Sequence, residues 1–242
     1  MAAAQRQASE PCDLHVPGQN RLLFVAEEAG HAVKRLERVT LKKKAPLHKP
    51  DVPLTHAYFP LTGVGSLVTG VEGGAALEVG TMGNEGMAGI PLLLGADRTH
   101  TDCFVQIEGD FMSMTREALE TELRSNSAFA DITRRYVQAF FAQAAQSAAC
   151  LRFHRIEQRL CRWILESHDR VADNTVALTQ EFLAIMLGVQ RPGVTLAAAQ
   201  LQKAGYIEYH RGVIQVLDRE GLEASSCDCY RIVRGEYERL LC

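Results

Sequence analysis

The sequence predicts an α+β protein in which a β-rich part comes first, long helices follow, and a helix-turn-helix with a hairpin lies near the end. The distribution of glycine and proline predicts the division into a β-rich part and a helical part. Glycine and proline are dense over residues 46–95, whereas neither occurs between Gly109 and Gly188. The periodicity of residues 178–216 predicts the motif, because two helical stretches joined at a glycine precede two β-rich stretches.

Residues 20–126 are expected to form the β-rich domain, preceded by an N-terminal extension over residues 1–19. A short helix over residues 20–32 opens the domain, with Leu22 and Val25 on its apolar side. The strands that follow are expected over residues 39–47, 56–60, 64–71, 76–82, 102–107 and 110–115, separated by turns rich in glycine, proline and aspartate such as Gly73-Gly74. Several short strands at this spacing suggest a small barrel or sandwich.

Residues 127–150 are expected to form a long helix that pairs with a second copy of the chain. One apolar stripe runs at helical spacing from Phe129 to Phe140, and a second stripe runs beside it from Val137 to Ala148. One stripe can pack on the chain's own β-rich domain and the other on a partner, although a single buried helix in a monomer would show the same pattern. The residues expected at the dimer interface are Val137, Phe140, Phe141, Ala144, Ala145 and Ala148.

The remaining residues, 151–242, are expected to form a C-terminal domain around the helix-turn-helix. Thr179 can cap the first helix of the motif, and Gly188 permits the left-handed backbone of the short turn that ends it. The second helix starts around Arg191-Pro192, because proline at a first helical position loses no hydrogen bond, and Gly205 closes it.

The flanking elements complete this domain. Two β-rich stretches around a turn at Gly212 are expected to form a wing, and such a motif is suited to entering a DNA major groove. The other expected elements are a helix over residues 156–168, a hinge over residues 169–177, a helix over residues 219–224 capped by Asp218, and a last amphipathic helix over residues 229–241.

The segment over residues 178–207, LTQEFLAIMLGVQRPGVTLAAAQLQKAGYI, resembles the DNA-binding motif of the Crp/Fnr family of bacterial transcription regulators. A weaker resemblance extends over nearly the whole chain. The family joins an N-terminal effector-sensing barrel to a long dimerisation helix and a winged helix-turn-helix. The resemblance therefore implies a double-stranded β-helix, a jelly roll like that of cyclic-nucleotide-binding domains, with residues 56–71 and 79–90 as barrel strands and pocket loop.

The same resemblance implies which residues contact DNA. Arg191 matches the family's base-reading arginine at the start of the recognition helix. Pro192 replaces a glutamate that is common at the next position, and Leu196 stands where many members have a second base-contacting arginine, so the docking mode is implied but not the usual operator. The residues expected at the DNA are Thr179, Gln180, Gln190, Arg191, Gly193, Thr195, Lys203 and Arg211.

Effector binding is expected in a pocket between the barrel and the long helix. The closest equivalents of the family's ribose-binding turn and phosphate-binding pair are Gly83, Asn84, Glu85, Gly86, Met87, Arg98 and Thr99. The separation of Glu85 from Arg98 is longer than in cyclic-nucleotide-binding relatives, and the turn also differs. A small anionic effector of unknown identity is therefore expected rather than a cyclic nucleotide, while surface loop residues without a ligand remain an open alternative.

No catalytic site, metal site or other cofactor is expected. The seven cysteines lack the N-terminal clustering by which oxygen-sensing relatives hold an iron–sulfur cluster, and Cys227 and Cys229 alone are too few for a structural zinc site. The eight histidines do not show the spacing by which barrel-shaped cupin enzymes bind metal, and no nucleophile–base arrangement or phosphate loop occurs. The sequence therefore predicts a protein that is not an enzyme.

Composition is consistent with a cytoplasmic protein of more than one domain. The chain has 242 residues, is 47% hydrophobic and 23% charged, and shows neither a signal-peptide pattern nor a membrane-spanning apolar run. Its net charge of −3 gives no overall attraction to nucleic acid, so affinity must come from a local patch that is doubled in a dimer. The expected partners are double-stranded DNA, a second copy and RNA polymerase, with no membrane. Two alternatives remain: a ligand-binding or scaffold module without DNA binding, and a cyclic-nucleotide-responsive regulator.

Overall fold

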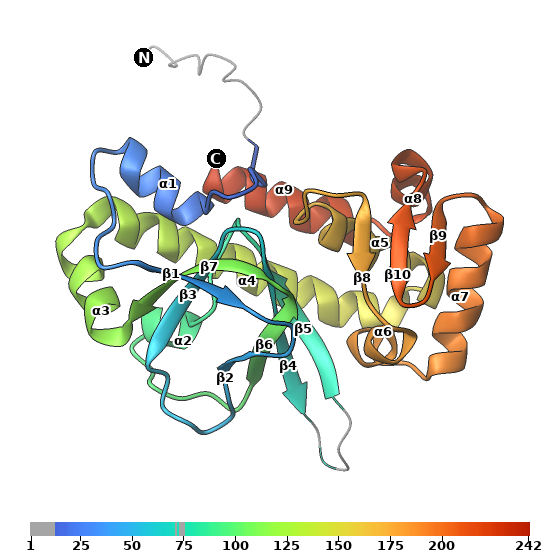
Figure 1. Ribbon diagram of the computed structural model, residues 1–242, viewed down its shortest axis with the longest axis horizontal. Coiled ribbons are helices and arrows are strands. Elements are labelled where there is room, and N and C mark those ends of the chain that lie inside the picture. Colours follow the sequence, from blue (N-terminus) through green and yellow to red (C-terminus); the bar gives the residue numbers. More distant parts are fainter. Residues whose placement is uncertain (1–12, 71, 73–75) are drawn as a thin grey trace, which may run out of the picture.

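A computed structural model describes residues 13–70, 72 and 76–242 (Figure 1). Most of the expected N-terminal extension, with Cys12, and the expected turn glycines Gly73 and Gly74 lie outside these residues. A β-barrel fills one half of the molecule, a long helix runs past it, and a smaller helical domain with its own three-stranded sheet lies at the other end.

The barrel is built from two antiparallel sheets. The first has the strand order β1-β7-β3 and the second the order β2-β6-β4-β5. The strands are β1 (Glu37–Leu41), β2 (Pro46–His48), β3 (His56–Pro60), β4 (Val64–Gly70), β5 (Ala76–Met82), β6 (Asp102–Ile107) and β7 (Gly109–Thr115). Helix α1 (Arg21–Glu28) precedes them, and its N-cap Asn20 accepts hydrogen bonds from the backbone N–H groups of Leu22 and Leu23. Two packed antiparallel sheets match the predicted jelly roll.

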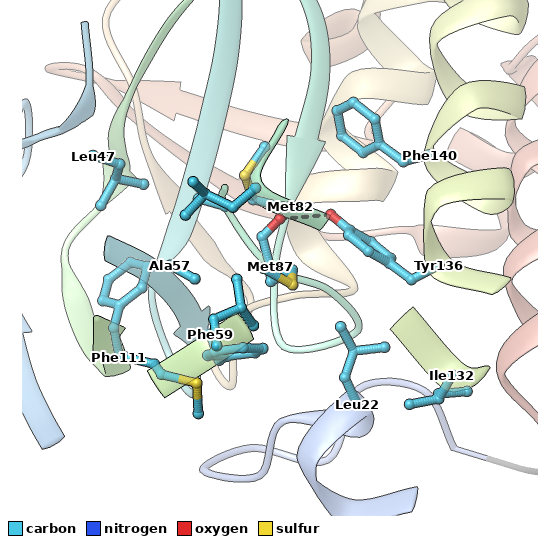
Figure 2. Close-up of a cluster of buried hydrophobic side chains, with 14 of the residues drawn as sticks. Leu22, Leu47, Ala57, Phe59, Met82, Met87, Phe111, Ile132, Tyr136 and Phe140 are labelled. Carbon is cyan, nitrogen blue, oxygen red and sulfur yellow. Dashed lines mark hydrogen bonds between the residues drawn. The ribbon is translucent and has the colours of Figure 1, made fainter. Parts of the chain in front are cut away.

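Alternation of side chains along the strands creates the barrel core. Phe59 of β3 and Phe111 of β7 point inward with no exposed surface, and Met82 and Met87 fill the space between the sheets (Figure 2). The single strand expected over residues 39–47 is instead two, β1 and β2, because the chain turns at Lys44, whose φ is +69°. Two short helices, α2 (Ile90–Leu93) and α3 (Arg116–Ser125), were not among the predicted elements.

Helix α4 (Ser127–Phe153) is the predicted long helix, three residues longer at its C-terminal end. Tyr136 is fully buried, and its hydroxyl donates to the carbonyl of Met87 at 2.9 Å (Figure 2). Phe140, expected at the dimer interface, is only 7% exposed and lies against Gly80 of its own barrel, so it is not available to a partner. Phe141 beside it is 67% exposed.

Apart from one additional strand, the C-terminal domain has the predicted order of elements. These are α5 (Ile156–His168), β8 (Thr175–Ala177), α6 (Gln180–Leu187), α7 (Arg191–Lys203), β9 (Ile207–His210), β10 (Val213–Val216) and α8 (Arg219–Ser225), with the sheet order β8-β10-β9. Its core is a cluster distinct from the main barrel core and includes Trp163, Leu183, Val194 and Ile214, and Val68 of the barrel strand β4 also belongs to it. Strand β8, which the sequence analysis left within the hinge, pairs with β10 through Val176 and Ile214.

Helix α9 (Cys229–Leu241) leaves this domain and returns to the barrel side, where Figure 1 shows it beside α1 and α4. Val233, Tyr237 and Leu241 recur at helical spacing and are buried in the core that also holds the barrel and α4. This helix was expected to be part of the C-terminal domain, but its apolar face packs on α4. Among the described residues no single helix has the length and hydropathy of a membrane span; only the bent pair α6 and α7 reaches them together.

Candidate nucleic-acid interface

Local sequence fixes both ends of the helix-turn-helix as predicted. The Thr179 side chain accepts a hydrogen bond from the backbone N–H of Phe182, and Gly188 ends α6 with a φ of +59°. The chain then bends by 105° between α6 and α7, within the range that helix-turn-helix motifs use. Proline stands in the first turn of α7, and Gly205 follows that helix with a φ of +79°.

The start of α6, the start of α7 and the wing turn together form an open groove of about 310 Å³. Four of the expected DNA-binding residues line it: Thr179, Gln180, Arg191 and Arg211. Glu181, Tyr209 and Gly212 complete its walls and were not among the expected residues. The sequence could have indicated Glu181, because it lies one residue after Gln180 on the same helix start, but only the folded hairpin brings Tyr209 to the groove.

Arg191 lies at the edge of this groove with 62% of its side chain exposed. Its Nη1 is 2.8 Å from Oε1 of Glu181, which is similarly exposed. An exposed ion pair of this kind contributes little stability, so Arg191 can exchange Glu181 for a phosphate or a base edge at small cost. The guanidinium is the planar donor group that pairs with guanine O6 and N7.

The wing turn presents a second arginine. Arg211 and Gly212 both have positive φ, +48° and +80°, in a two-residue connection between β9 and β10. Positive φ is sterically unfavourable for arginine, and a turn of this type is more easily formed by asparagine or glycine. Arginine at this unfavourable position places a positive charge in the lining of the groove, where it can contact DNA.

The other expected DNA contacts are three exposed polar residues and one glycine that packs against α5. Thr195 donates to Oε1 of Gln180 at 2.8 Å, which joins the exposed sides of the two helices, while Gln190 and Lys203 lie exposed at opposite ends of α7. Gly193 was expected to face DNA, but a Cβ at this position would lie 3.1 Å from Ile156 of α5. It therefore serves the close approach of two helices. Leu196 is 62% exposed on α7 and can contact a thymine methyl group.

Tyr209 has a fixed position at the base of the groove. Its hydroxyl donates to the carbonyl of Leu178 at 2.8 Å. Burial, and secondly the charge of Glu181, raise the pKa of Tyr209 to about 12, so the phenol stays neutral and keeps its proton for this hydrogen bond. The bond ties the hairpin to the segment that precedes α6.

The residues expected to bind an effector do not form one site. The turn residues are all buried: Gly83, Asn84, Glu85, Gly86 and Met87. Arg98 is exposed instead, and its Nε is 4.0 Å from Oδ2 of Asp97. Thr99 bonds to Thr101 at 3.0 Å between their hydroxyls. The structure therefore does not bring Arg98 to Glu85.

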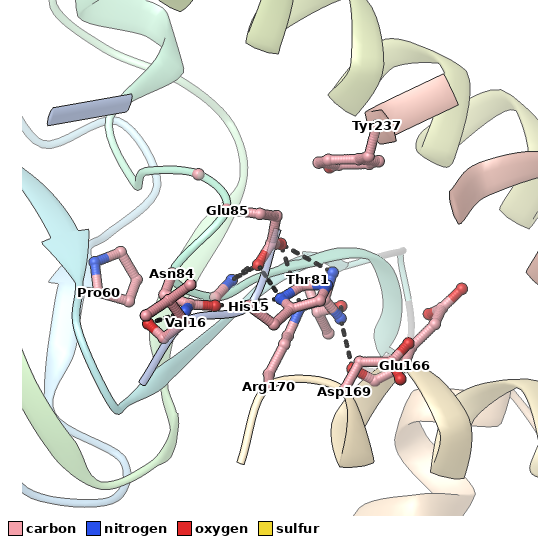
Figure 3. Close-up of polar contacts among 12 residues, drawn as sticks. His15, Val16, Pro60, Thr81, Asn84, Glu85, Glu166, Asp169, Arg170 and Tyr237 are labelled. Carbon is pink, nitrogen blue, oxygen red and sulfur yellow. Dashed lines mark hydrogen bonds and ion pairs between the residues drawn. The ribbon is translucent and has the colours of Figure 1, made fainter. Parts of the chain in front are cut away.

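Glu85 instead pairs with Arg170, which follows α5 at the start of the expected hinge (Figure 3). The Nε and Nη2 atoms of Arg170 lie 3.0 and 2.8 Å from Oε1 of Glu85, and its Nη1 donates to Thr81 Oγ1 at 2.7 Å. Burial alone would raise the pKa of Glu85, but the charges of Arg170 and then His15, with hydrogen bonds from Arg170 and Gly83, hold it below its usual value. This pair joins the barrel turn to the C-terminal domain.

The glycines beside Glu85 have a packing role. A Cβ at Gly83 would overlap the aliphatic part of Arg170, and a Cβ at Gly86 would overlap the ring of Tyr136. The absence of side chains therefore lets the hinge arginine and the long helix approach the turn, which leaves no room there for an effector in this conformation.

A cavity of about 140 Å³ does lie inside the barrel, next to this turn. Its walls are mainly apolar, with Met82, Met87 and Phe140 facing it, and polar groups come from His48, Thr99 and Thr101. Met87 and Thr99 are the two expected effector residues that line it. Burial lowers the pKa of His48, partly offset by Asp102, so this imidazole is held neutral.

Comparisons with known proteins agree with this architecture. Residues 158–225 match the family model described as a Crp-like helix-turn-helix domain. No curated protein matches the sequence.

Similar solved structures cover both halves of the chain. FixK2 from Bradyrhizobium japonicum superposes with a TM-score of 0.66 at 16% identity, over 79% of this chain and 98% of that one. A Crp/Fnr family transcriptional regulator from Thermus thermophilus gives 0.60 at 23% identity, over 78% and 98%. The c-di-GMP-responsive regulator CLP from Xanthomonas campestris gives 0.60 at 15% identity, over 79% and 97%. The chain therefore carries a Crp-like helix-turn-helix domain within the overall fold of the Crp/Fnr transcription regulators.

Proposed function

We propose that this protein is a homodimeric, sequence-specific DNA-binding transcription regulator whose helix α7 enters the major groove. The groove between α6, α7 and the wing carries this proposal, because it gathers Arg191, Arg211, Gln180 and Thr179 on one open face. Arginine, glutamine and threonine are residue types that bond base edges and phosphates. Arg191 reads a base edge, and Arg211 contacts the phosphate backbone beside it.

A two-fold arrangement supplies the affinity that net charge does not. Phe141, Ala145 and Ala148 are exposed on one side of α4. A phenylalanine that is 67% exposed beside small residues favours close pairing with a second α4. Two copies of the groove then meet two half-sites about one helical turn apart. The expected contact with RNA polymerase and the cytoplasmic location remain predictions that follow from this function.

The barrel cavity is the proposed effector site. Its 140 Å³ is below the roughly 300 Å³ at which drug-sized ligand pockets begin, so a cyclic nucleotide does not fit without rearrangement. The apolar walls favour a small, largely apolar molecule with one or two hydrogen-bonding groups near Thr99 and Thr101. This differs from the anionic effector that the sequence indicated, because Arg98 is not at the cavity.

Three contacts can transmit a change in the barrel to the C-terminal domain. Phe104 of β6 packs edge-on against Phe182 of α6, with ring centroids 6.1 Å apart. The indole of Trp163 donates to Glu78 at 2.8 Å, and the Glu85–Arg170 pair joins the hinge to the turn that borders the cavity. An effector shifts the equilibrium only if it binds one arrangement of these contacts better than another.

Selection from a pool of random DNA duplexes tests the proposed function. The full-length protein is expected to enrich a two-fold symmetric sequence, with specific binding at least about a thousandfold tighter than non-specific binding at physiological salt. Arg191→Ala should relax the preference at one base pair in each half-site, whereas Arg231→Ala, which removes another exposed arginine on α9, should leave the selected sequence unchanged. Enrichment of no sequence by the wild-type protein would favour the alternative of a ligand-binding or scaffold module.

A further inference from the structure

Four side chains from two distant segments meet where α4 ends and α9 begins. They are Cys150, His154, Cys227 and Cys229, and their ligand atoms all lie within 4.8 Å of one another. The three cysteines form a small buried cluster of their own, and His154 is partly exposed at its edge. From the sequence, only Cys227 and Cys229 were expected to lie close together, because Cys150 and Cys227 are 77 positions apart.

Local structure aims all four side chains at one point. Cys150 lies in the last turn of α4 and His154 is the C-cap of that helix, so the two are four positions apart on the same helix face. Cys229 is the first residue of α9, and Cys227 lies two positions before it in the connection from α8. The packing of α9 on α4 brings the two pairs together.

Two of the separations between ligand atoms are close to those of tetrahedral metal coordination, and the others are at most 4.8 Å. The sulfur atoms of Cys150 and Cys227 are 3.5 Å apart, and the sulfur of Cys229 is 3.4 Å from Nδ1 of His154. A tetrahedral zinc ion with Zn–S bonds of about 2.3 Å and Zn–N bonds of about 2.0 Å separates its ligand atoms by about 3.5–3.8 Å. A disulfide would instead require sulfur atoms about 2.05 Å apart.

We propose that Cys150, His154, Cys227 and Cys229 form a binding site for one Zn²⁺ ion per chain. Three thiolates and one imidazole are a donor set of structural zinc sites, and four protein ligands leave no open position for catalysis. Thiolate ligands also select zinc over magnesium or calcium, which prefer oxygen.

The surroundings supply what such a site needs. The side-chain amide of Gln146 donates to the sulfur of Cys229 at 3.1 Å, which is the kind of outer hydrogen bond that orients a metal ligand. Three thiolates and one divalent cation carry a single negative charge. The buried guanidinium of Arg162 interacts electrostatically first with Glu166, whose Oε1 lies 3.7 Å from its Nε, and then with all three cysteines. Its Nε and Nη1 atoms have no hydrogen-bond partner among the described residues. Arg162 therefore offsets part of this charge, because it is shared between Glu166 and the cysteines.

The site has a clear structural consequence. The C-terminal domain is joined to the rest of the chain at two junctions, from α4 into α5 and from α8 into α9. His154 lies at the first junction and Cys227 at the second, so a shared ion fastens both. Zinc then restricts how far this domain can turn relative to α4. This proposal does not depend on the proposed DNA binding.

Metal analysis of the full-length protein tests the site. The protein, dialysed against metal-free buffer, should contain one zinc per chain by mass spectrometry of the elements. Replacement of zinc by Co²⁺ should give the visible absorption of tetrahedral cobalt with thiolate ligands. Both signals should be lost in Cys229→Ser and His154→Ala and kept in Cys103→Ser, which removes a buried free cysteine of the barrel. His154→Cys should restore binding, because four cysteines also hold zinc.

The variants separate loss of metal from loss of fold. His154 is only partly buried, so His154→Ala should retain the circular dichroism spectrum of the wild-type protein. A chelator should lower the melting temperature of the wild type and of Cys103→Ser but not that of His154→Ala. Wild-type protein without stoichiometric zinc after exposure to Zn²⁺, zinc retained by both ligand variants, or an iron–sulfur chromophore in place of zinc would each overturn the proposal.

Discussion

Replacing Arg170 by methionine should destabilise the protein strongly, because it leaves a buried carboxylate without its partner. Arg170 and Glu85 have 5% and 1% of their side chains exposed. In Arg170→Met, the partners that Glu85 keeps among the described residues are the backbone N–H of Gly83, at 3.0 Å, and Nδ1 of His15, at 3.6 Å. Removing one partner of a buried ion pair costs about 3–5 kcal/mol, and methionine preserves much of the apolar packing against Gly83.

The expected loss is large enough for simple measurements. A free-energy change of this size lowers the melting temperature of a chain of this length by about 6–20 °C. Urea titration followed by circular dichroism gives the free energy directly. Arg124→Met is the matched control, because Arg124 pairs with Glu120 at 3.2 Å on the surface of α3 and should change stability by less than about 0.5 kcal/mol.

A double variant and a change of pH identify the source of the lost stability. In Glu85→Gln/Arg170→Met neither charge remains, so the double variant should be more stable than Arg170→Met alone. Lower pH should also reduce the difference in the free energy of unfolding between Arg170→Met and the wild type. The folded pKa of Glu85 is depressed in the wild type, so its contribution is present above the unfolded value of about 4.5 and lost as pH falls through the folded pKa. A free energy of unfolding of Arg170→Met within about 1 kcal/mol of the wild type would refute the role assigned to this pair.

Three other predictions address the interface between copies, pH and the effector. Phe141→Glu should dissociate the dimer, as measured by sedimentation, because it places an unpaired charge between the paired helices. Thr121→Glu, at an exposed position of α3, should leave the dimer intact. A wild-type protein that is monomeric and still binds DNA fully would contradict this. Burial, offset in part by hydrogen bonds from Ser66 and Trp163, raises the pKa of Glu78 to about 7, so the free energy of unfolding should fall as pH rises from about 4.5 to 7. In urea titrations, the effect of Glu78→Gln on this free energy should be up to about 3 kcal/mol more favourable at pH 8 than at pH 5. An equal effect at both pH values would exclude this shift. Cyclic AMP should leave the melting temperature unchanged, whereas the true effector at 100 times its dissociation constant should stabilise the folded protein by about 2.7 kcal/mol. Micromolar binding of cyclic AMP that Arg98→Ala abolishes would instead support the alternative of a cyclic-nucleotide-responsive regulator.

Local signals made most of the elements predictable. Strand β5, helix α5 and helix α9 have the predicted bounds, because apolar periodicity and flanking turn residues define each of them. The caps at Thr179 and Gly188 were also predictable, since each depends on the residue itself and its immediate neighbours. The groove residues on α6 and α7 followed from these boundaries.

Contacts between distant segments were not predictable in the same way. Glu85 was expected to act with Arg98, thirteen positions away, but the fold gives it Arg170, 85 positions away. Phe140 and Phe141 are adjacent and equally apolar, and only the position of the barrel decides that the first is covered by the chain itself. The cluster around Cys150 likewise exists only because α9 packs back on α4.

Sequence-specific DNA binding by two chains is tested by fluorescence anisotropy at physiological salt. The equilibrium affinity of the full-length protein is measured for a selected operator and for a scrambled duplex of equal length and composition. We expect tight binding of two chains to the operator and at least about a thousandfold weaker binding to the scrambled duplex. Arg191→Ala should lose about 1–3 kcal/mol of binding free energy per half-site on the operator alone. Equal affinity for both duplexes, or an operator affinity that Arg191→Ala leaves unchanged, would contradict these expectations.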